Sequence, residues 1–134
     1  MTSRRQARRR AIDVLYQADV TGADPLAVIG AWQEAGREVQ PFARELVEGV
    51  TACVGEIDEL LGRFAEEWTV ERMTSLDRTI LRVACFEVLH RDDIPTAVAI
   101  DEAVEAAKTL SSEESAGFVN GILGRIAREA ADRP

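Results

Sequence analysis

The stretch SLDRTILRVACFEVLHR, residues 75–91, determines the fold that we predict. Its apolar residues recur at spacings of three and four and occupy most of the circumference of an α-helix. A helix with this pattern is buried on most of its sides, so we expect residues 76–91 to form the central helix of the protein. The charges of Asp77 and Arg82 fall within its apolar arcs.

Apolar spacings of three and four continue over the rest of the chain, and the alternation typical of strands is almost absent. The sequence predicts seven helical segments, at residues 3–21, 25–36, 41–68, 69–73, 76–91, from 95 onward and after 111–114. The expected caps are a capping box of Ser3 and Gln6, an N-cap at Ser75, and a second capping box of Ser111 and Glu114. We therefore predict an all-α fold, a single domain over residues 1–134, with about seven helices arranged as two packed bundles.

Length and composition are those of one globular domain, with 134 residues of which 46% are hydrophobic. No apolar run approaches the roughly 18 residues that cross a membrane. The N-terminal arginines precede amphipathic sequence, unlike the apolar core of a secretory signal. Cys53 and Cys85 lie in apolar helical patterns, so we expect buried thiols in a reducing compartment rather than a disulfide. These features favour a cytoplasmic protein with no membrane partner.

The usual sequence motifs of catalysis are missing. Lys108, the only lysine, has no glycine before it at P-loop spacing, and the glycines at 117, 121 and 124 do not match a dinucleotide-binding motif. His90 is the only histidine, and with two distant cysteines it cannot build a usual zinc site, so we expect a capping or surface residue. We predict a protein that is not an enzyme and has no metal or cofactor.

Positive charge is concentrated at one end of an otherwise acidic chain. The stretch SRRQARRRAI, residues 3–12, contains five arginines, and all 24 acidic residues follow it in a chain of net charge −8. Cations at a helix N-terminus oppose the helix dipole at a cost of about a few tenths of a kcal/mol each, so local helix stability does not explain them. Two interpretations remain: a basic arm that pairs with the acidic body, or a patch that binds nucleic-acid phosphates.

The first predicted helix separates into two faces on a helical wheel. Its core stripe consists of Ala7, Ala11, Val14, Leu15 and Ala18. A second line beside that stripe consists of Arg5, Arg9, Ile12 and Tyr16. Such a mixture of charge and apolar surface suits either RNA or a protein interface. The protein is expected to be a monomer or a homodimer, and a homodimer that buried this line would compete with RNA.

Three positions on the central and last helices each allow two roles. Asp77 either interacts favourably with the helix dipole in the first turn or faces a partner. Arg82 either forms a buried ion pair or reaches a ligand. Phe118 either packs in the core or serves as an exposed platform on which a base stacks.

Three stretches carry a resemblance to a known family: SRRQARRRAIDVLYQAD, SLDRTILRVACFEVLHRDDIPTAVAIDEAVEAAK and FVNGIL. Their order and spacing resemble the NusB family of bacterial transcription antitermination factors over nearly the whole chain, most weakly between residues 22 and 68. The resemblance implies an all-α fold of two three-helix bundles and no catalysis. It also implies binding to single-stranded boxA RNA of ribosomal RNA transcripts, pairing with the ribosomal protein NusE, and action on the transcription elongation complex.

The resemblance also implies roles for individual residues. The RNA-binding residues it implies are Arg4, Arg5, Arg8, Arg9, Glu71, Ser75, Arg82, Glu114 and Phe118. The protein-partner residues it implies are Tyr16 and Asp77. Gly117 stands where relatives often have a cation, so the last helix is expected to contribute less to RNA binding. The alternative is a protein-interaction or regulatory NusB-like domain, related to the N-terminal regions of ribosomal RNA methyltransferases.

Overall fold

All regular secondary structure is helical in the residues that the structure, a computed structural model, describes, namely 3–65 and 69–131. In chain order the elements are α1 (Arg4–Thr21), α2 (Pro25–Glu34), α3 (Pro41–Phe64), the 3-10 helix η1 (Val70–Arg72), α4 (Ser75–His90), α5 (Thr96–Leu110) and α6 (Glu113–Ala131). No strand occurs in these ranges, which confirms the all-α prediction. None of the described helices is both long and apolar enough to cross a membrane.

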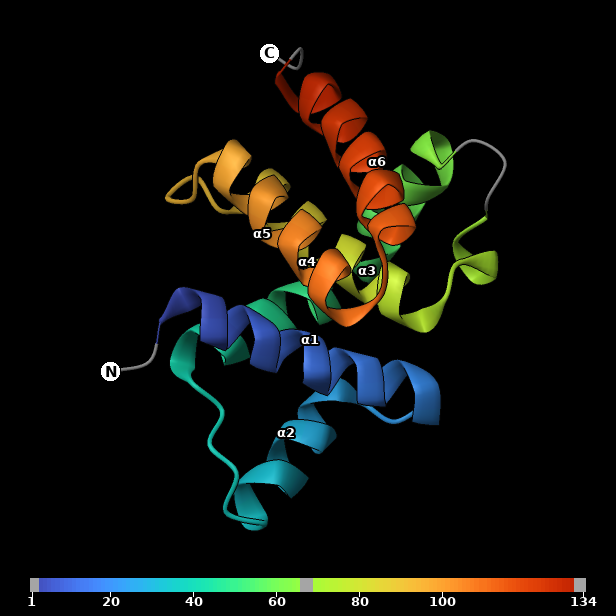
Figure 1. The fold of residues 1–134 in the computed structure, drawn as a ribbon. Coiled ribbons are helices and arrows are strands. Elements are labelled where there is room, and N and C mark those ends of the chain that lie inside the picture. The colour runs from blue at the N-terminus through green and yellow to red at the C-terminus, as the bar shows by residue number, and fades with distance from the viewer. Residues whose placement is uncertain (1–2, 66–68, 132–134) are drawn as a thin grey trace.

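Helix α4 is the central helix, as its sequence predicts. It packs against α1, α3, α5 and α6, and Figure 1 shows it surrounded by them. Its side chains at Ile80, Leu81, Ala84 and Cys85 are almost completely buried. Because apolar residues cover most of its circumference, α4 can bury surface against several neighbours at once.

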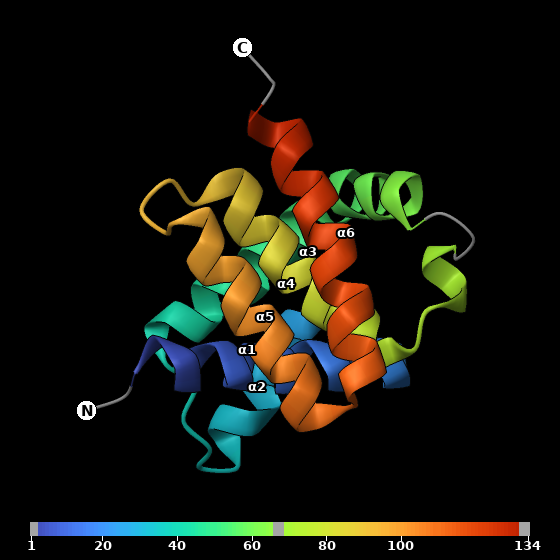
Figure 2. The same ribbon diagram turned by 45° about the horizontal axis from the view of Figure 1, so that its top comes forward.

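The helices form two bundles, and α4 of the second bundle packs against the first. Helices α1, α2 and α3 pack together, as do α4, α5 and α6, and α4 joins the two groups by packing on α1 and α3 (Figures 1 and 2). Alanines on the inner face of α5, Ala99, Ala103 and Ala107, are buried. Small side chains at these positions let neighbouring helices approach α5 closely. One continuous cluster of buried residues extends through both bundles.

The helix ends agree with the predictions in part. Ser3 and Gln6 form the predicted capping box. The N-cap of α4 is Thr74 rather than Ser75, because the Thr74 hydroxyl accepts the N–H of Asp77 at 3.1 Å. The predicted capping box at Ser111 is also wrong, since it is the Ser112 hydroxyl that accepts a backbone N–H in the first turn of α6, at 3.0 Å.

The segment before α4 agrees with the prediction of a short turn that begins at Thr69 and ends at Met73. The predicted turn at 69–73 is a single turn of 3-10 helix. Helix α3 ends at Phe64, whereas the sequence predicted its end near Trp68, a residue outside those that the structure describes.

Helices α3 and α4 approach closely at Gly49. A Cβ atom at this position would lie only 2.1 Å from the Cζ atom of Phe86, so the aromatic ring occupies the space that a side chain would need. Phe86 is itself buried, and its ring lies 5.7 Å from the ring of His90. The glycine therefore fixes the separation of the two helices at this level.

Candidate nucleic-acid interface

Two exposed arginines at the start of α1 form ion pairs that solvent weakens. Arg5 contacts Glu102 of α5 with nitrogen–oxygen distances of 3.1–3.3 Å, although its side chain is 70% exposed. Arg4 contacts Asp93 at 3.4 Å, but that carboxylate is held more closely by Arg91, at 2.9 and 3.0 Å. Exposed pairs of this kind contribute about 0–1 kcal/mol each, so another anion can displace the carboxylates at little cost.

The next two cations differ from each other. Arg9 is exposed and makes no ion pair or hydrogen bond with any residue in the described ranges. Arg10 is half-buried, and its guanidinium lies over the ring of Trp32 at 5.5 Å from the ring centre. Arg4, Arg5 and Arg9 are therefore the guanidinium groups of this cluster that are open to a ligand.

Arg8 departs from the expectation that it faces RNA. Its side chain is 8% exposed and pairs with Glu87 of α4 at 2.7 Å. The reason is its register, because residues 8, 11 and 15 lie on one face of α1, and Ala11 and Leu15 are core residues. Burial raises the pKa of Glu87, and this effect outweighs the opposing hydrogen bond and charge of Arg8. Arg8 therefore holds α1 on α4 through its ion pair with Glu87.

Arg82 likewise forms an ion pair inside the protein, which is the first of the two roles that the sequence allowed. Its guanidinium donates to both oxygens of Asp58 on α3, at 2.8 and 2.7 Å, and lies 3.4 Å from Asp19 on α1. Arg78 donates to Asp19 at 2.6 Å. This network uses Arg82 to join α1, α3 and α4.

The network also controls the ionisation of Asp19. Burial alone would raise the pKa of its carboxyl group. Hydrogen bonds from Arg78 and Ser75, together with the charges of Arg78 and Arg82, outweigh burial and hold that pKa below its ordinary value.

A hollow of about 230 Å³ lies where η1 and the start of α4 meet the start of α6. Its lining includes Arg72, Met73, Asp77, Glu114 and Phe118. The structure thus brings together, from segments about 40 residues apart, three of the predicted site residues. Phe118 is half-buried and packs against the core, which is the first of the two roles that the sequence allowed, and it also lines the hollow.

Asp77 is the unusual group in this hollow. It is buried, and its Oδ2 atom accepts a hydrogen bond from the Ser115 hydroxyl at 3.2 Å. Its Oδ1 atom is buried without a hydrogen-bond partner among the described residues. An unsatisfied buried acceptor costs about 1–3 kcal/mol, so this atom suits a donor supplied by a binding partner. Its place in the first turn of α4 is also favourable for the helix dipole.

The other predicted residues in this part of the chain and on the second half of α1, namely Glu71, Ser75 and Tyr16, do not line the hollow. Glu71 and Glu114 are exposed carboxylates, and Ser75 is half-buried with its hydroxyl 3.3 Å from Arg78. Tyr16 is 42% exposed on α1.

The predicted site residues fall into two groups along α1. Arg5 and Tyr16 are separated by 11 residues, which is about 16 Å of helix rise. The predicted exposed line of Arg5, Arg9, Ile12 and Tyr16 is not continuous on the surface, because Ile12 is buried beneath α5. It forms part of the floor of a groove between α1 and α5, with Arg5 and Arg9 on one side and Glu102 and Glu105 on the other. The sequence had not indicated these acidic groups, because they lie about 100 residues away along the chain.

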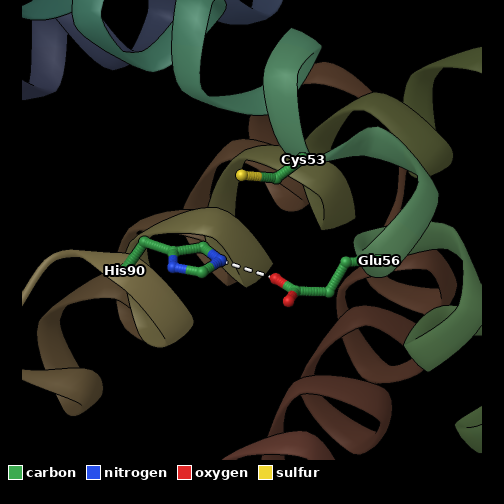
Figure 3. Close-up of side chains that lie close together, drawn as sticks. All are labelled: Cys53, Glu56 and His90. Atoms are coloured by element: carbon green, nitrogen blue, oxygen red, sulfur yellow. Dashed lines mark hydrogen bonds and ion pairs between the residues drawn. The ribbon is translucent and has the colours of Figure 1, made fainter.

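A third group of side chains is also absent from the predictions. Cys53 and Glu56 of α3 lie beside His90 at the end of α4, as Figure 3 shows. His90 is a surface residue, as expected, but the expectation that the cysteines are distant from it is wrong for Cys53. Both cysteines are free thiols. Burial raises the pKa of Cys85 to about 12, with further contributions from the nearby carboxylates of Glu56 and Asp58.

Comparison with known proteins agrees with this architecture. The family model described as "NusB family" matches residues 5–128. The chain belongs to the NusB family. Transcription antitermination protein NusB of Salinispora tropica is 46% identical over 134 residues, covering 97% of this chain and 98% of the relative. Transcription antitermination protein NusB of Saccharopolyspora erythraea is 51% identical and covers 95% and 88%.

Solved structures of NusB proteins share the fold. T. maritima NusB superimposes with a TM-score of 0.87 at 36% identity, covering 97% of this chain and 94% of that one. A chain from a structure of the antitermination factors NusB and NusE in complex with dsRNA has a TM-score of 0.83 over 94% of this chain, and at 24% identity it supports the fold alone. Membership of the NusB family confirms the expected family and the expectation of an antitermination protein rather than an enzyme.

Proposed function

We propose that this protein binds the boxA segment of ribosomal RNA transcripts together with ribosomal protein NusE, and so helps the transcription elongation complex to resist termination in the cytoplasm. The observation that carries the proposal is the arginine cluster at the start of α1. It concentrates accessible guanidinium groups on a protein whose net charge is −8. Family membership supports the same function.

The RNA surface in this proposal begins at Arg4, Arg5 and Arg9. A phosphate can replace Asp93 as the partner of Arg4 and Glu102 as the partner of Arg5, because these ion pairs are exposed and weak. The planar guanidinium fork matches a phosphate group in two hydrogen bonds. A local cluster on an acidic protein suits one oriented strand rather than general binding to nucleic acid.

The surface continues to the hollow at the start of α6. The half-buried ring of Phe118 supplies a face on which an unpaired base can stack. The exposed carboxylates of Glu71 and Glu114 repel phosphates, so in this proposal they accept hydrogen bonds from base amino groups, and Ser75 lies at the edge of the same region.

The protein-partner surface in this proposal is formed by Tyr16 and Asp77. The unpaired Oδ1 atom of Asp77 is an acceptor for a cationic or amide donor. An acidic protein attracts a basic ribosomal protein and orients it during encounter.

Titration of a fluorescent single-stranded boxA RNA by anisotropy, at several salt concentrations and with or without NusE, tests the proposal. Replacing Arg5 and Arg9 by Ala should weaken binding and lower the salt slope by roughly 0.7 for each lost phosphate contact. The matched control is Arg63→Ala, because Arg63 is also an exposed arginine that pairs with a glutamate, at 3.2 Å. An unchanged slope in the double variant, with its far-UV circular dichroism intact, would refute the phosphate role.

The partner surface is tested separately with Asp77→Ala. We expect weaker binding of NusE, because the variant lacks the carboxylate that the partner would contact. Loss of thermal stability with full NusE affinity would assign Asp77 to the helix dipole alone.

One observation favours the alternative of a protein-interaction domain without RNA. Arg4 and Arg5 already pair with carboxylates of the same chain, which is what a basic arm that binds the acidic body would do. The same titration separates the two functions, because a pure protein-interaction domain would bind NusE or another protein with no dependence on boxA RNA.

A further inference from the structure

We propose that Cys53, Glu56 and His90 form a binding site for a zinc-type divalent metal ion, which bridges α3 and α4. Cys53 and Glu56 are three residues apart on α3 and so project from the same face of that helix. His90 is the last residue of α4. Donor atoms of the three side chains lie within 4.8 Å of one another, and Figure 3 shows them converging from the two helices.

The donor set selects the metal. A thiolate, an imidazole and a carboxylate are the three ligand types that Zn²⁺ uses in proteins, whereas Mg²⁺ and Ca²⁺ prefer oxygen ligands alone. The bond lengths of a tetrahedral zinc site place its donor atoms roughly 3.3–3.6 Å apart. The Nε2 atom of His90 lies 2.5 Å from the Oε1 atom of Glu56, so these two groups separate slightly to admit an ion.

The two side chains that must separate to admit an ion, Glu56 and His90, lie at the surface and can move. Glu56 and His90 are both exposed, and Cys53 is half-buried. Three protein ligands leave a fourth position for water or another exchangeable ligand.

The backbone that carries these ligands is held in place. The ring of His90 packs 5.7 Å from the ring of Phe86, which in turn fills the space above Gly49 on α3. The guanidinium group of the neighbouring Arg91 forms ion pairs with Asp93 at 2.9 Å and with Glu45 at 3.7 Å. These carboxylates largely balance its positive charge, which would otherwise repel a metal ion. The close approach of α3 and α4 therefore sets the spacing of the ligands before an ion binds.

A metal at this position would join the two bundles at their contact. It would stabilise the folded protein, because the ligands come together only when α3 packs on α4. It would also shield the Cys53 thiol from alkylation and oxidation.

The test is a titration of the reduced, untagged full chain with Co²⁺ and with Zn²⁺. Cobalt reports a thiolate ligand through a charge-transfer absorption, and we expect saturation at one equivalent and displacement by zinc. Cys53→Ser should abolish that absorption, and Glu56→Gln and His90→Gln should each weaken zinc binding at least tenfold. Zinc should raise the midpoint of thermal unfolding of the wild type but not of His90→Gln.

The matched control is Glu59→Gln, because Glu59 is an exposed carboxylate one turn from the site on the same helix. Its zinc affinity should equal that of the wild type. The proposal is overturned if no saturable binding occurs, if Cys53→Ser keeps the cobalt absorption, or if Glu56→Gln and His90→Gln bind zinc as tightly as Glu59→Gln does. Far-UV circular dichroism of each variant establishes that these surface substitutions leave the fold intact.

Discussion

The contact between Gly49 and Phe86 leads to a paired prediction on one helix. Gly49 and Gly55 both lie inside α3, and alanine at either position gains about 1 kcal/mol of helix propensity. A Cβ atom at Gly55 would meet nothing within 4 Å. A Cβ atom at Gly49 would lie 2.1, 2.4 and 2.6 Å from three atoms of the Phe86 ring.

The structure gives the size of the difference. Carbon atoms pack at about 3.5–4.0 Å, so the Phe86 ring must move by more than 1 Å in Gly49→Ala. The ring is buried, and forcing a well-packed core to accept an extra methyl group costs about 1–3 kcal/mol. Because the gain in propensity is common to both variants, Gly49→Ala should unfold with a free energy about 1–3 kcal/mol below that of Gly55→Ala.

Chemical denaturation followed by circular dichroism measures this difference. Gly55→Ala should be more stable than the wild type, by about 0.4–1 kcal/mol. In a Phe86→Leu background the penalty of Gly49→Ala should shrink, because the tip of the ring is gone. Equal stability of Gly49→Ala and Gly55→Ala would refute the close contact.

Three further predictions follow from the ionisable groups. Arg8→Ala leaves the Glu87 carboxylate buried without its partner, so the free energy of unfolding should fall by about 3–5 kcal/mol, and a loss under 1 kcal/mol would contradict the buried pair. The pKa of Asp19 is lowered in the folded state, so the stability advantage of the wild type over Asp19→Asn should be complete above the ordinary value of 3.8 and should disappear as the pH falls through the lowered pKa; an advantage that grows on acidification would reverse this assignment. At neutral pH iodoacetamide should modify Cys53 well before Cys85, whose pKa is about 12, and mass spectrometry showing equal labelling in the folded protein would disagree.

The sequence by itself determined the helices and their central member. The period of 3.6 residues is a local property, so the stretch from Ser75 to Arg91 was sufficient to predict that α4 is buried on most sides. Helix ends were less secure. Thr74 and Ser75 are both good capping residues, and the choice between them depends on which hydroxyl reaches the free N–H groups of the first turn.

The candidate site was predicted only as far as its residue types. The concentration of arginines at the start of α1 is visible in the sequence, and Arg5 and Arg9 are exposed as expected. The sequence could not show that Arg8 meets Glu87, because the two residues are 79 positions apart and the pair depends on how α1 lies on α4.

Tertiary structure alone decided which side chains meet across helices. Arg82 joins Asp58, and Cys53 lies beside His90, because the closeness of α3 and α4 is set by packing at Gly49. The spacing of apolar residues predicts which face of a helix is buried. It does not predict the angle and register at which another helix packs on that face. Ion pairs and ligand sets between helices depend on that angle and register, and so they are decided by the packed structure.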